Sequence, residues 1–262
     1  MQTVLNDLSS EKGLSLLKFF QVIQSIGLFI IPPVVVAYFF HAKPAVYLQV
    51  KKIPYGKSIL LVIAIVYFSE PLINWLSEVN SNLVLPQWMD GLQNWMKESE
   101  DQASKLTKAF LETGSVSDLF FNIFMIGLLP ALGEELLFRG VIQKLLKKLT
   151  GNAHAAIWLS AILFSALHMQ FFGFLPRLLL GAMFGYMLEW SGSLWLPIIA
   201  HFVNNATAVV AYYLQEKGII GKNIEEVGTS SDGTSYLVFI SIIFLFILFR
   251  LLYLNNKVIE EE

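Results

Sequence analysis

Gly133-Glu134-Glu135-Leu136-Leu137-Phe138-Arg139 places three charged side chains inside a stretch of the chain that is otherwise apolar. The apolar run from Leu119 to Leu132 leads directly into it, and hydrophobic residues continue beyond it as far as Lys144. Ionisable groups at membrane depth cost several kcal/mol unless they are paired or line a wet cavity. The stretch therefore predicts a helical membrane protein with a functional site inside the membrane.

The composition of the whole chain agrees with a membrane protein. Hydrophobic residues make up 55% and charged residues 15% of the 262 residues, whereas soluble proteins carry about 25% charged residues. The net charge of -2 gives no basic bias towards nucleic acid, and the absence of cysteine excludes disulfides. We expect an all-α, multi-pass helical bundle whose surroundings are the lipid bilayer, with no nucleic-acid partner.

Seven stretches approach the roughly 20 apolar residues that a helix needs to cross a bilayer. They are Leu16–Phe40, Ser58–Leu76, Val116–Leu146, Ala153–Phe172, Leu175–Trp190, Leu194–Leu214 and Ser235–Leu254. The sequence thus predicts seven transmembrane helices, or eight if a further interfacial or re-entrant segment is present.

These spans divide the chain into three parts. Residues 1–115 hold two spans and a polar loop, residues 116–213 hold a helical core with the charged stretch, and residues 214–262 hold a loop, the last span and an acidic tail. The polar segment Leu85–Leu111 has two interpretations: a surface helix lying on the lipid headgroups, or an ordinary extramembrane helix.

The loop charges predict an orientation, because lysine and arginine gather in cytoplasmic loops. With seven alternating spans, nine cations fall on one side: Lys43, Lys51, Lys52, Lys57, Lys144, Lys147, Lys148, Arg250 and Lys257. The acidic loops fall on the other side. The C-terminus is therefore expected in the cytoplasm.

Four histidines differ in their sequence surroundings. His41 and His154 stand at the predicted ends of spans, where histidine is common, whereas His168 and His201 stand inside apolar runs. A lone buried histidine is usually structural, but these two accompany Glu134 in the same membrane core. We interpret the set as one site.

Helical spacing separates the polar residues into pairs, because residues i and i+4 share a face. Glu135 and Arg139 have this spacing, which predicts an internal ion pair that leaves Glu134 free to face a cavity. His201 and Asn205 have the same spacing, whereas Asn204 is offset and is the weaker candidate.

The depth of each residue can be estimated from the rise of about 1.5 Å per helical residue. Glu134 and His168 both lie roughly 20 Å from the same side of the membrane by this measure. His201 is shallower, and it reaches their level only if the turn Ser191-Gly192-Ser193 is drawn into the protein.

A carboxylate and an imidazole in such a pocket can hold and deprotonate water, and a second histidine with an amide can stabilise an oxyanion. This set predicts a peptide hydrolase without a covalent nucleophile. Zinc is the alternative, with Glu134, His168 and His201 as three ligands and water as the fourth. The sequence lacks His-Glu-x-x-His, so the cofactor question stays open between a divalent metal such as zinc and none.

Three motifs carry a family resemblance: Glu134-Glu135-x-x-x-Arg139, Phe164-x-x-x-His168 and His201-x-x-x-Asn205. Together they resemble the CPBP intramembrane proteases, which comprise the type II CAAX prenyl endopeptidases and the bacterial Abi or bacteriocin-processing proteins. The resemblance covers about Val116–Tyr213.

The resemblance implies a conical cavity open to the cytoplasm and a protein or peptide substrate at the membrane. It implies that Glu134 and His168 activate water, that His201 and Asn205 stabilise the oxyanion, and that Glu135 and Arg139 support the site. Phe164 would shape the cavity.

Two other functions fit the same residues. Intramembrane Glu and His also build proton relays in transporters, although such carriers favour inverted repeats and none is evident in the sequence. A non-catalytic membrane scaffold that has kept the fold is the third possibility.

Overall fold

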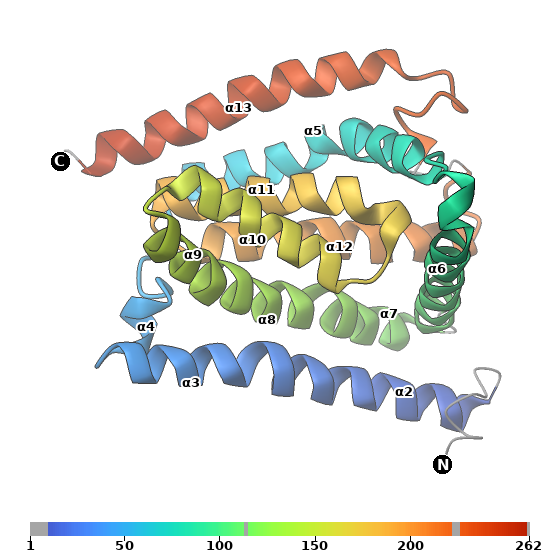
Figure 1. Cartoon of the computed structure of the whole chain (residues 1–262), viewed down its shortest axis with the longest axis horizontal. Helices are drawn as coiled ribbons and strands as arrows, with labels where there is room; N and C mark the ends of the chain where they lie inside the picture. The colour runs from blue at the N-terminus through green and yellow to red at the C-terminus, as the bar shows by residue number, and fades with distance from the viewer. Residues whose placement is uncertain (1–9, 113–114, 222–225, 261–262) are drawn as a thin grey trace.

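The computed structural model describes residues 10–112, 115–221 and 226–260, and within these residues every regular element is helical. Most of the long helices run side by side as a bundle, and one helix crosses an end of it (Figure 1). The predicted all-α bundle is therefore confirmed. Glu225 in the last polar loop, and Glu261 and Glu262 of the acidic tail, lie outside the described residues.

The helices follow one another without an intervening strand in the described part of the chain. They are α2 Glu11–Gln24, α3 Ile31–Phe40, α4 Pro44–Tyr47, α5 Gly56–Ser81, α6 Asp90–Leu111, α7 Val116–Asn122, α8 Leu129–Leu137, α9 Gln143–Thr150, α10 Ala153–Leu167, α11 Phe174–Ser191, α12 Trp195–Glu216 and α13 Tyr236–Glu260. Short π-helical stretches, Ser25–Ile30, Ile123–Leu128 and Phe138–Ile142, join α2 to α3, α7 to α8 and α8 to α9.

Five helical segments are long and apolar enough to cross a membrane: Lys12–Phe40, Gly56–Ser81, Val116–Thr150, Phe171–Ser191 and Tyr236–Lys257. The other two predicted spans correspond to α10 and α12. Helix α10 has 15 residues and ends at Leu167, five residues before the predicted end at Phe172. The chain leaves the helix there because Met169 adopts a positive φ of 53°. Helix α12 is long enough to cross a membrane, but it carries the polar residues His201, Asn204 and Asn205 and is not among the five apolar segments.

The bundle has two chemically different ends. Helix α4 and the end of α9 lie at one end, and α6 lies crosswise at the other (Figure 1). We call the first the lysine end, because cavities there are lined by Lys51 and Lys52 and by Lys144 and Lys147. We call the second the α6 end. Helix α2 begins at the α6 end and α13 finishes at the lysine end, as an odd number of crossings requires.

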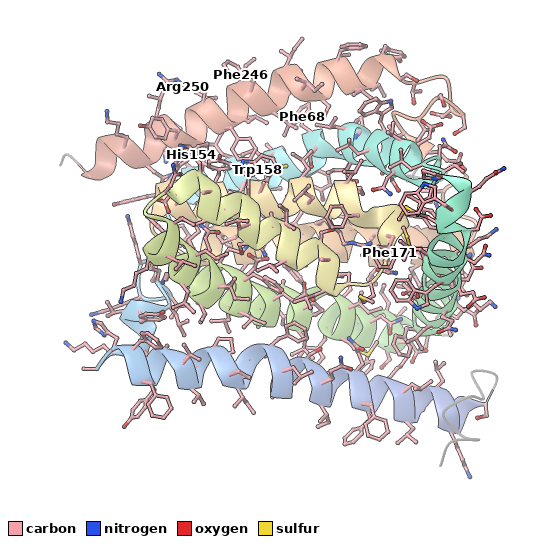
Figure 2. All side chains as sticks on the ribbon, in the orientation of Figure 1. Phe68, His154, Trp158, Phe171, Phe246 and Arg250 are labelled. Carbon is pink, nitrogen blue, oxygen red and sulfur yellow. The ribbon has the colours of Figure 1, made fainter. Side chains whose placement is uncertain are left out.

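The largest hydrophobic core joins helices from all three predicted parts of the chain. Val62, Ile65 and Val66 of α5 pack with Met183 and Phe184 of α11 in this core. Helix α12 contributes Leu196 and Ala200, and α13 contributes Leu245 and Leu252. Side chains on the outer side of α13, such as Phe246, point away from the bundle (Figure 2).

Two glycines allow helices to approach closely around the site. A Cβ atom at Gly185 would lie 2.8 Å from Ile157, and one at Gly181 would lie 3.1 Å from Ala161. Small residues at this spacing let helix backbones pack together in membranes. The close contact of α10 with α11 brings the carbonyls of both glycines within reach of α9 and its preceding π-helical stretch.

Candidate active site

Glu135 and Arg139 form the buried ion pair that their spacing predicts. Arg139 Nη1 lies 3.0 Å from Glu135 Oε1, and the side chains are 1% and 0% exposed, respectively. Arg139 Nη2 also donates to the carbonyl of Gly181 at 2.8 Å. A buried ion pair needs such additional hydrogen bonds to offset its desolvation, and the close approach of α11 at Gly181 provides one.

Aromatic rings surround the guanidinium of Arg139. Its Cζ lies 4.6 Å from the ring centroid of Phe164 and 5.5 Å from that of Phe184, which are cation–π distances. Phe164 also contacts His168 edge-on, with ring centroids 4.9 Å apart. The predicted packing residue Phe164 therefore lies between the ion pair and the histidine.

His201 is joined to the ion pair through Glu135. Its Nδ1 lies 2.9 Å from Glu135 Oε1, and its ring stacks on Phe184 at 5.4 Å. A carboxylate accepts hydrogen bonds, so Nδ1 carries the proton and Nε2 faces Glu134. The segment Ser191-Gly192-Ser193 that precedes α12 contains two buried serines, and Ser193 Oγ donates to the carbonyl of Lys52. The turn is thus drawn into the protein.

His168 approaches the same point from α10. Its Nδ1 lies 2.8 Å from the carbonyl oxygen of Phe164, so this nitrogen is the donor and Nε2 faces the site. In both histidines, Nδ1 therefore donates to a fixed acceptor. This hydrogen bond orients the ring and selects the tautomer.

Glu134 lies between the two imidazoles. Its Oε2 is 3.9 Å from His168 Nε2 and 3.9 Å from His201 Nε2. This oxygen is buried and has no hydrogen-bond partner in the described part of the protein. Glu134, His168 and His201 are thus brought together around one point, where a water molecule can satisfy the carboxylate oxygen.

The spacing of these three atoms is sufficient for a water molecule. A water forms hydrogen bonds of about 2.8 Å, so it bridges atoms 3.9 Å apart without displacement. Zinc holds its ligands at about 2.0–2.2 Å, which places neighbouring donors about 3.3 Å apart. The donor types and tautomers fit zinc, but within the described residues no group of three or more His, Cys, Asp or Glu side chains is spaced to bind a metal ion.

Asn205 lies one turn beyond His201 on α12 and bonds to the backbone. Its Nδ2 donates to the carbonyl oxygen of Ile126 at 3.2 Å, within the π-helical stretch of the neighbouring segment. Its Oδ1 accepts from Asn204 Nδ2 at 3.2 Å. Asn205 therefore has one amide hydrogen left for a ligand, while Asn204 orients it.

The other two histidines lie elsewhere. His154 Nδ1 is 2.8 Å from the hydroxyl of Tyr186, and His154 is near the start of α10 (Figure 2). His41 Nδ1 accepts from the backbone N–H of Lys43. Neither contacts Glu134, as the sequence analysis expected of them.

Asn80 and Glu100 hold the segment after His168, and neither was among the predicted site residues. Asn80 Nδ2 donates to the carbonyl of Phe171 at 2.7 Å, and Asn80 Oδ1 accepts from Leu175 N–H at 2.8 Å. Glu100 of α6 accepts from the N–H of Phe172 at 3.3 Å. The sequence feature that could have indicated this contact is Asn80 itself, because a buried amide in the long helix α5 needs a specific hydrogen-bond partner.

Comparison with known proteins places residues 116–207 in a recognised group. This segment matches the family model described as type II CAAX prenyl endopeptidase Rce1-like, and it includes every predicted site residue. The match confirms the family resemblance and supports a CAAX-type peptidase at the level of the family. It covers less than half of the chain.

One curated relative is an uncharacterized protein, YpbD, of Bacillus subtilis (strain 168). It is 34% identical over 89 residues, which are 32% of this chain and 42% of the relative. The chain therefore spans less than half the length of the curated relative that it matches. No solved structure matches the chain.

Proposed function

We propose, on the premise that residues 116–207 match the Rce1-like peptidases, that this protein is an intramembrane endopeptidase. It would hydrolyse a peptide bond of a membrane-associated or lipidated protein or peptide. The observation that carries the proposal is the unpartnered Oε2 of Glu134, 3.9 Å from the Nε2 atoms of His168 and His201. An oxygen in this position needs a hydrogen donor, and water supplies it.

In the proposed reaction, Glu134 is the general base. A water held by Glu134 Oε2 and His168 Nε2 donates its hydrogens to these two acceptors, so that an oxygen lone pair is free to attack the substrate carbonyl. Glu134 takes the proton as the water attacks, and it can then give the proton to the leaving amine. Positioned acid–base catalysis contributes about 10²- to 10⁴-fold to a rate.

His201 and Asn205 would stabilise the oxyanion. Glu135 Oε1 accepts from His201 Nδ1 and from Arg139, which holds the imidazole of His201 with Nε2 facing the site. When Nε2 carries a proton, it donates to the developing oxyanion. The remaining amide hydrogen of Asn205 is the second donor, and fixed donors of this kind are effective where water is excluded.

Glu134, His168 and His201 are also the residues that would hold zinc, if the protein binds it. Bound zinc would lower the pKa of a coordinated water to about 7. Metal analysis of the purified protein distinguishes the two forms: stoichiometric zinc that is lost in His168→Ala supports a metallopeptidase, and full cleavage by metal-free protein supports the glutamate type.

The function is tested by comparing protein termini in the membranes of cells that carry wild type, Glu134→Gln or Glu189→Gln. Glutamine keeps the shape of Glu134 but is not a base. Glu189 pairs with Lys147 at the lysine end and serves as the matched control. We expect new termini with wild type and Glu189→Gln, and uncut precursors with Glu134→Gln.

Two results would point to the other functions. Unchanged biological activity in a Glu134→Ala/His168→Ala variant would establish a scaffold. Ion-dependent uptake into vesicles that disappears with Glu134→Gln, without any change in protein termini, would establish a carrier.

A further inference from the structure

An apolar groove lies between α11 and α13, apart from the candidate active site. It has a volume of about 650 Å³, and none of the predicted site residues lines it. Its apolar wall consists of Leu179, Met183 and Trp190 of α11 and Leu245, Phe246 and Phe249 of α13. Both helices belong to segments that are long and apolar enough to cross a membrane. The groove therefore opens towards the lipid of the bilayer.

The groove runs along both helices and finishes near the lysine end. Leu179 and Trp190 are about 16 Å apart along α11, at about 1.5 Å per helical residue. Arg250 and Tyr253 line the groove together with Trp190. The rings of Trp190 and Tyr253 contact edge-on, with centroids 5.5 Å apart, and Arg250 Cζ lies 5.7 Å from the Tyr253 centroid. A long apolar wall thus leads to a cation between two amphipathic aromatic side chains.

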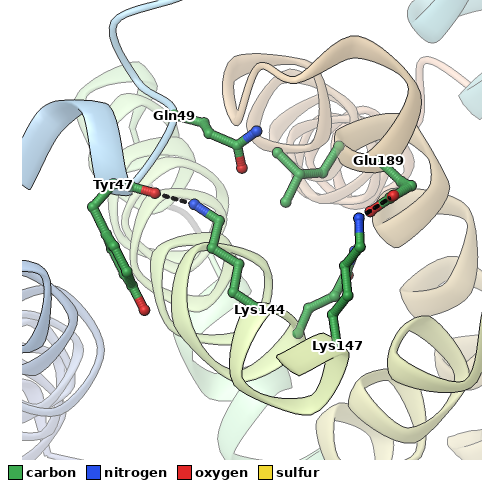
Figure 3. Close-up of a pocket in the computed structure, with 7 residues that line it drawn as sticks. Tyr47, Gln49, Lys144, Lys147 and Glu189 are labelled. Carbon is green, nitrogen blue, oxygen red and sulfur yellow. Dashed lines mark hydrogen bonds and ion pairs between the residues drawn. The ribbon is translucent and has the colours of Figure 1, made fainter. Parts of the chain in front are cut away.

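Arg250 has no counter-ion on the groove. It lies within the apolar segment Tyr236–Lys257, one turn after Phe246 (Figure 2). Among the residues that the structure describes, it forms no ion pair or hydrogen bond, and its contact is with the ring of Tyr253. Glu189, the acid next to Trp190, pairs with Lys147 instead (Figure 3). Cations inside membrane segments are costly unless they are paired or reach the interface.

The aromatic neighbours indicate the level at which Arg250 finds an anion. Tryptophan and tyrosine gather at the boundary between headgroups and acyl chains. Lipid phosphates lie at this level, and a guanidinium donates two parallel hydrogen bonds to a phosphate. Basic pockets between membrane helices bind phospholipid headgroups in this way. One cation above an apolar wall matches an amphiphile with one anionic headgroup.

We propose that the groove between α11 and α13 is a binding site for an anionic phospholipid. Its phosphate pairs with Arg250, and one acyl chain lies along Leu179, Met183 and Phe249. Acyl chains are as apolar as leucine, so the wall packs the chain without selecting the lipid. The selection comes from the charge of the headgroup at Arg250. This inference does not depend on the proposed peptidase activity.

The headgroup is tested by native mass spectrometry of the purified full-length protein in detergent. The two probes are phosphatidylglycerol and phosphatidylcholine with identical acyl chains. We expect wild type to bind phosphatidylglycerol about fivefold more tightly, because one cation near the membrane surface contributes about this factor. Arg250→Gln should bind both lipids equally. Arg250 is exposed, so this substitution leaves the core intact.

Lys257→Gln is the matched control, since Lys257 is an exposed cation on the same helix and does not line the groove. It should keep the preference for phosphatidylglycerol. A preference that survives Arg250→Gln would overturn the proposal. An equal loss in both variants would overturn it as well, because the attraction would then be the general charge of α13.

The acyl chain is tested by Leu179→Trp, which fills the apolar wall and leaves Arg250 in place. Bound phosphatidylglycerol stabilises the folded protein, so it should raise the melting temperature of wild type more than that of Leu179→Trp. Leu251→Trp is the control, because Leu251 is 44% exposed and lies outside the groove. Equal responses of the two variants to the lipid would contradict a chain in the groove.

Two other occupants give different results. Excess inorganic phosphate should not displace phosphatidylglycerol from wild type, and displacement would show that Arg250 binds a free anion. A lipid-free dimer that Leu179→Trp converts to monomer would show that a helix of a second copy fills the groove. Either result would overturn the lipid site.

Discussion

Glu134 and Glu135 are neighbours in the chain, yet they have different partners. Glu135 is fully buried and accepts from Arg139 and His201. Glu134 is 15% exposed, and its Oε2 lies 3.9 Å from the Nε2 atoms of His168 and His201. The helix causes this difference, because consecutive side chains point about 100° apart. One carboxylate therefore holds the structure, and the other is available for chemistry.

At the scale of single residues, we predict that Glu135→Ala destabilises the protein far more than Glu134→Gln. Removing one partner of a buried ion pair leaves an uncompensated charge and costs about 3–5 kcal/mol. Thermal unfolding of the purified protein, followed by tryptophan fluorescence, measures both variants.

The double variant Glu135→Leu/Arg139→Met is the control for this prediction. It removes both charges, and should recover part of the lost stability because no buried charge remains. Equal melting temperatures for Glu134→Gln and Glu135→Ala would contradict the assignment of the structural role to Glu135.

At the scale of elements, Gly133 sets the distance between α8 and the first span. A Cβ atom at Gly133 would lie 2.7 Å from Phe29 Cβ in the π-helical stretch Ser25–Ile30. We predict that Gly133→Ala displaces α8, lowers the melting temperature and reduces cleavage, because Glu134 is the next residue.

Gly127, in the same long helical segment, is the matched control. A Cβ atom there would lie 3.5 Å from Phe202, which is an ordinary contact. Gly127→Ala should leave both stability and cleavage close to wild type. Similar losses in the two variants would show that helix propensity, and not the contact with Phe29, explains the effect.

The segment between α10 and α11 depends on α5. We predict that Asn80→Ala increases amide hydrogen exchange at Phe172 and Leu175 and lowers the rate of cleavage, because Asn80 holds both sides of the turn after His168. Hydrogen-exchange mass spectrometry of the purified protein measures the change.

Asn74→Ala is the control, since Asn74 is on the same helix and donates to the carbonyl of Val227 instead. It should alter exchange near Val227 and leave the segment after His168 unchanged. Faster exchange at Leu175 in both variants would mean that α5 as a whole, and not Asn80, controls the turn.

At the scale of the whole molecule, the residues that match the family do not form a separate core. Val62, Ile65 and Val66 of α5 are completely buried against α11 and α12. We predict that residues 116–262 alone do not fold, and that supplying residues 1–112 as a second chain restores a protease-resistant complex. Limited proteolysis of detergent-solubilised membranes measures this, and a stable 116–262 fragment would contradict it.

Much of the fold follows from local rules that the sequence contains. The lengths of the apolar stretches specify membrane helices, and the spacing of Glu135 and Arg139 specifies their pair, since i and i+4 are neighbours on any helix. The sequence analysis placed the end of α10 at Phe172 instead of Leu167. Met169-Gln170-Phe171-Phe172 is largely apolar, although its backbone has already left the helix. Hydropathy does not detect a change of backbone conformation.

The sequence by itself determined that this is a multi-pass helical membrane protein whose residues 116–207 match a recognised peptidase family, with Glu134, His168 and His201 in its apolar core. Only the tertiary structure decided how near these residues come to one another, because their approach depends on the buried turn before α12 and the close packing of α10 on α11. Contacts between residues far apart in the chain result from packing of the whole molecule, and no local spacing rule contains them.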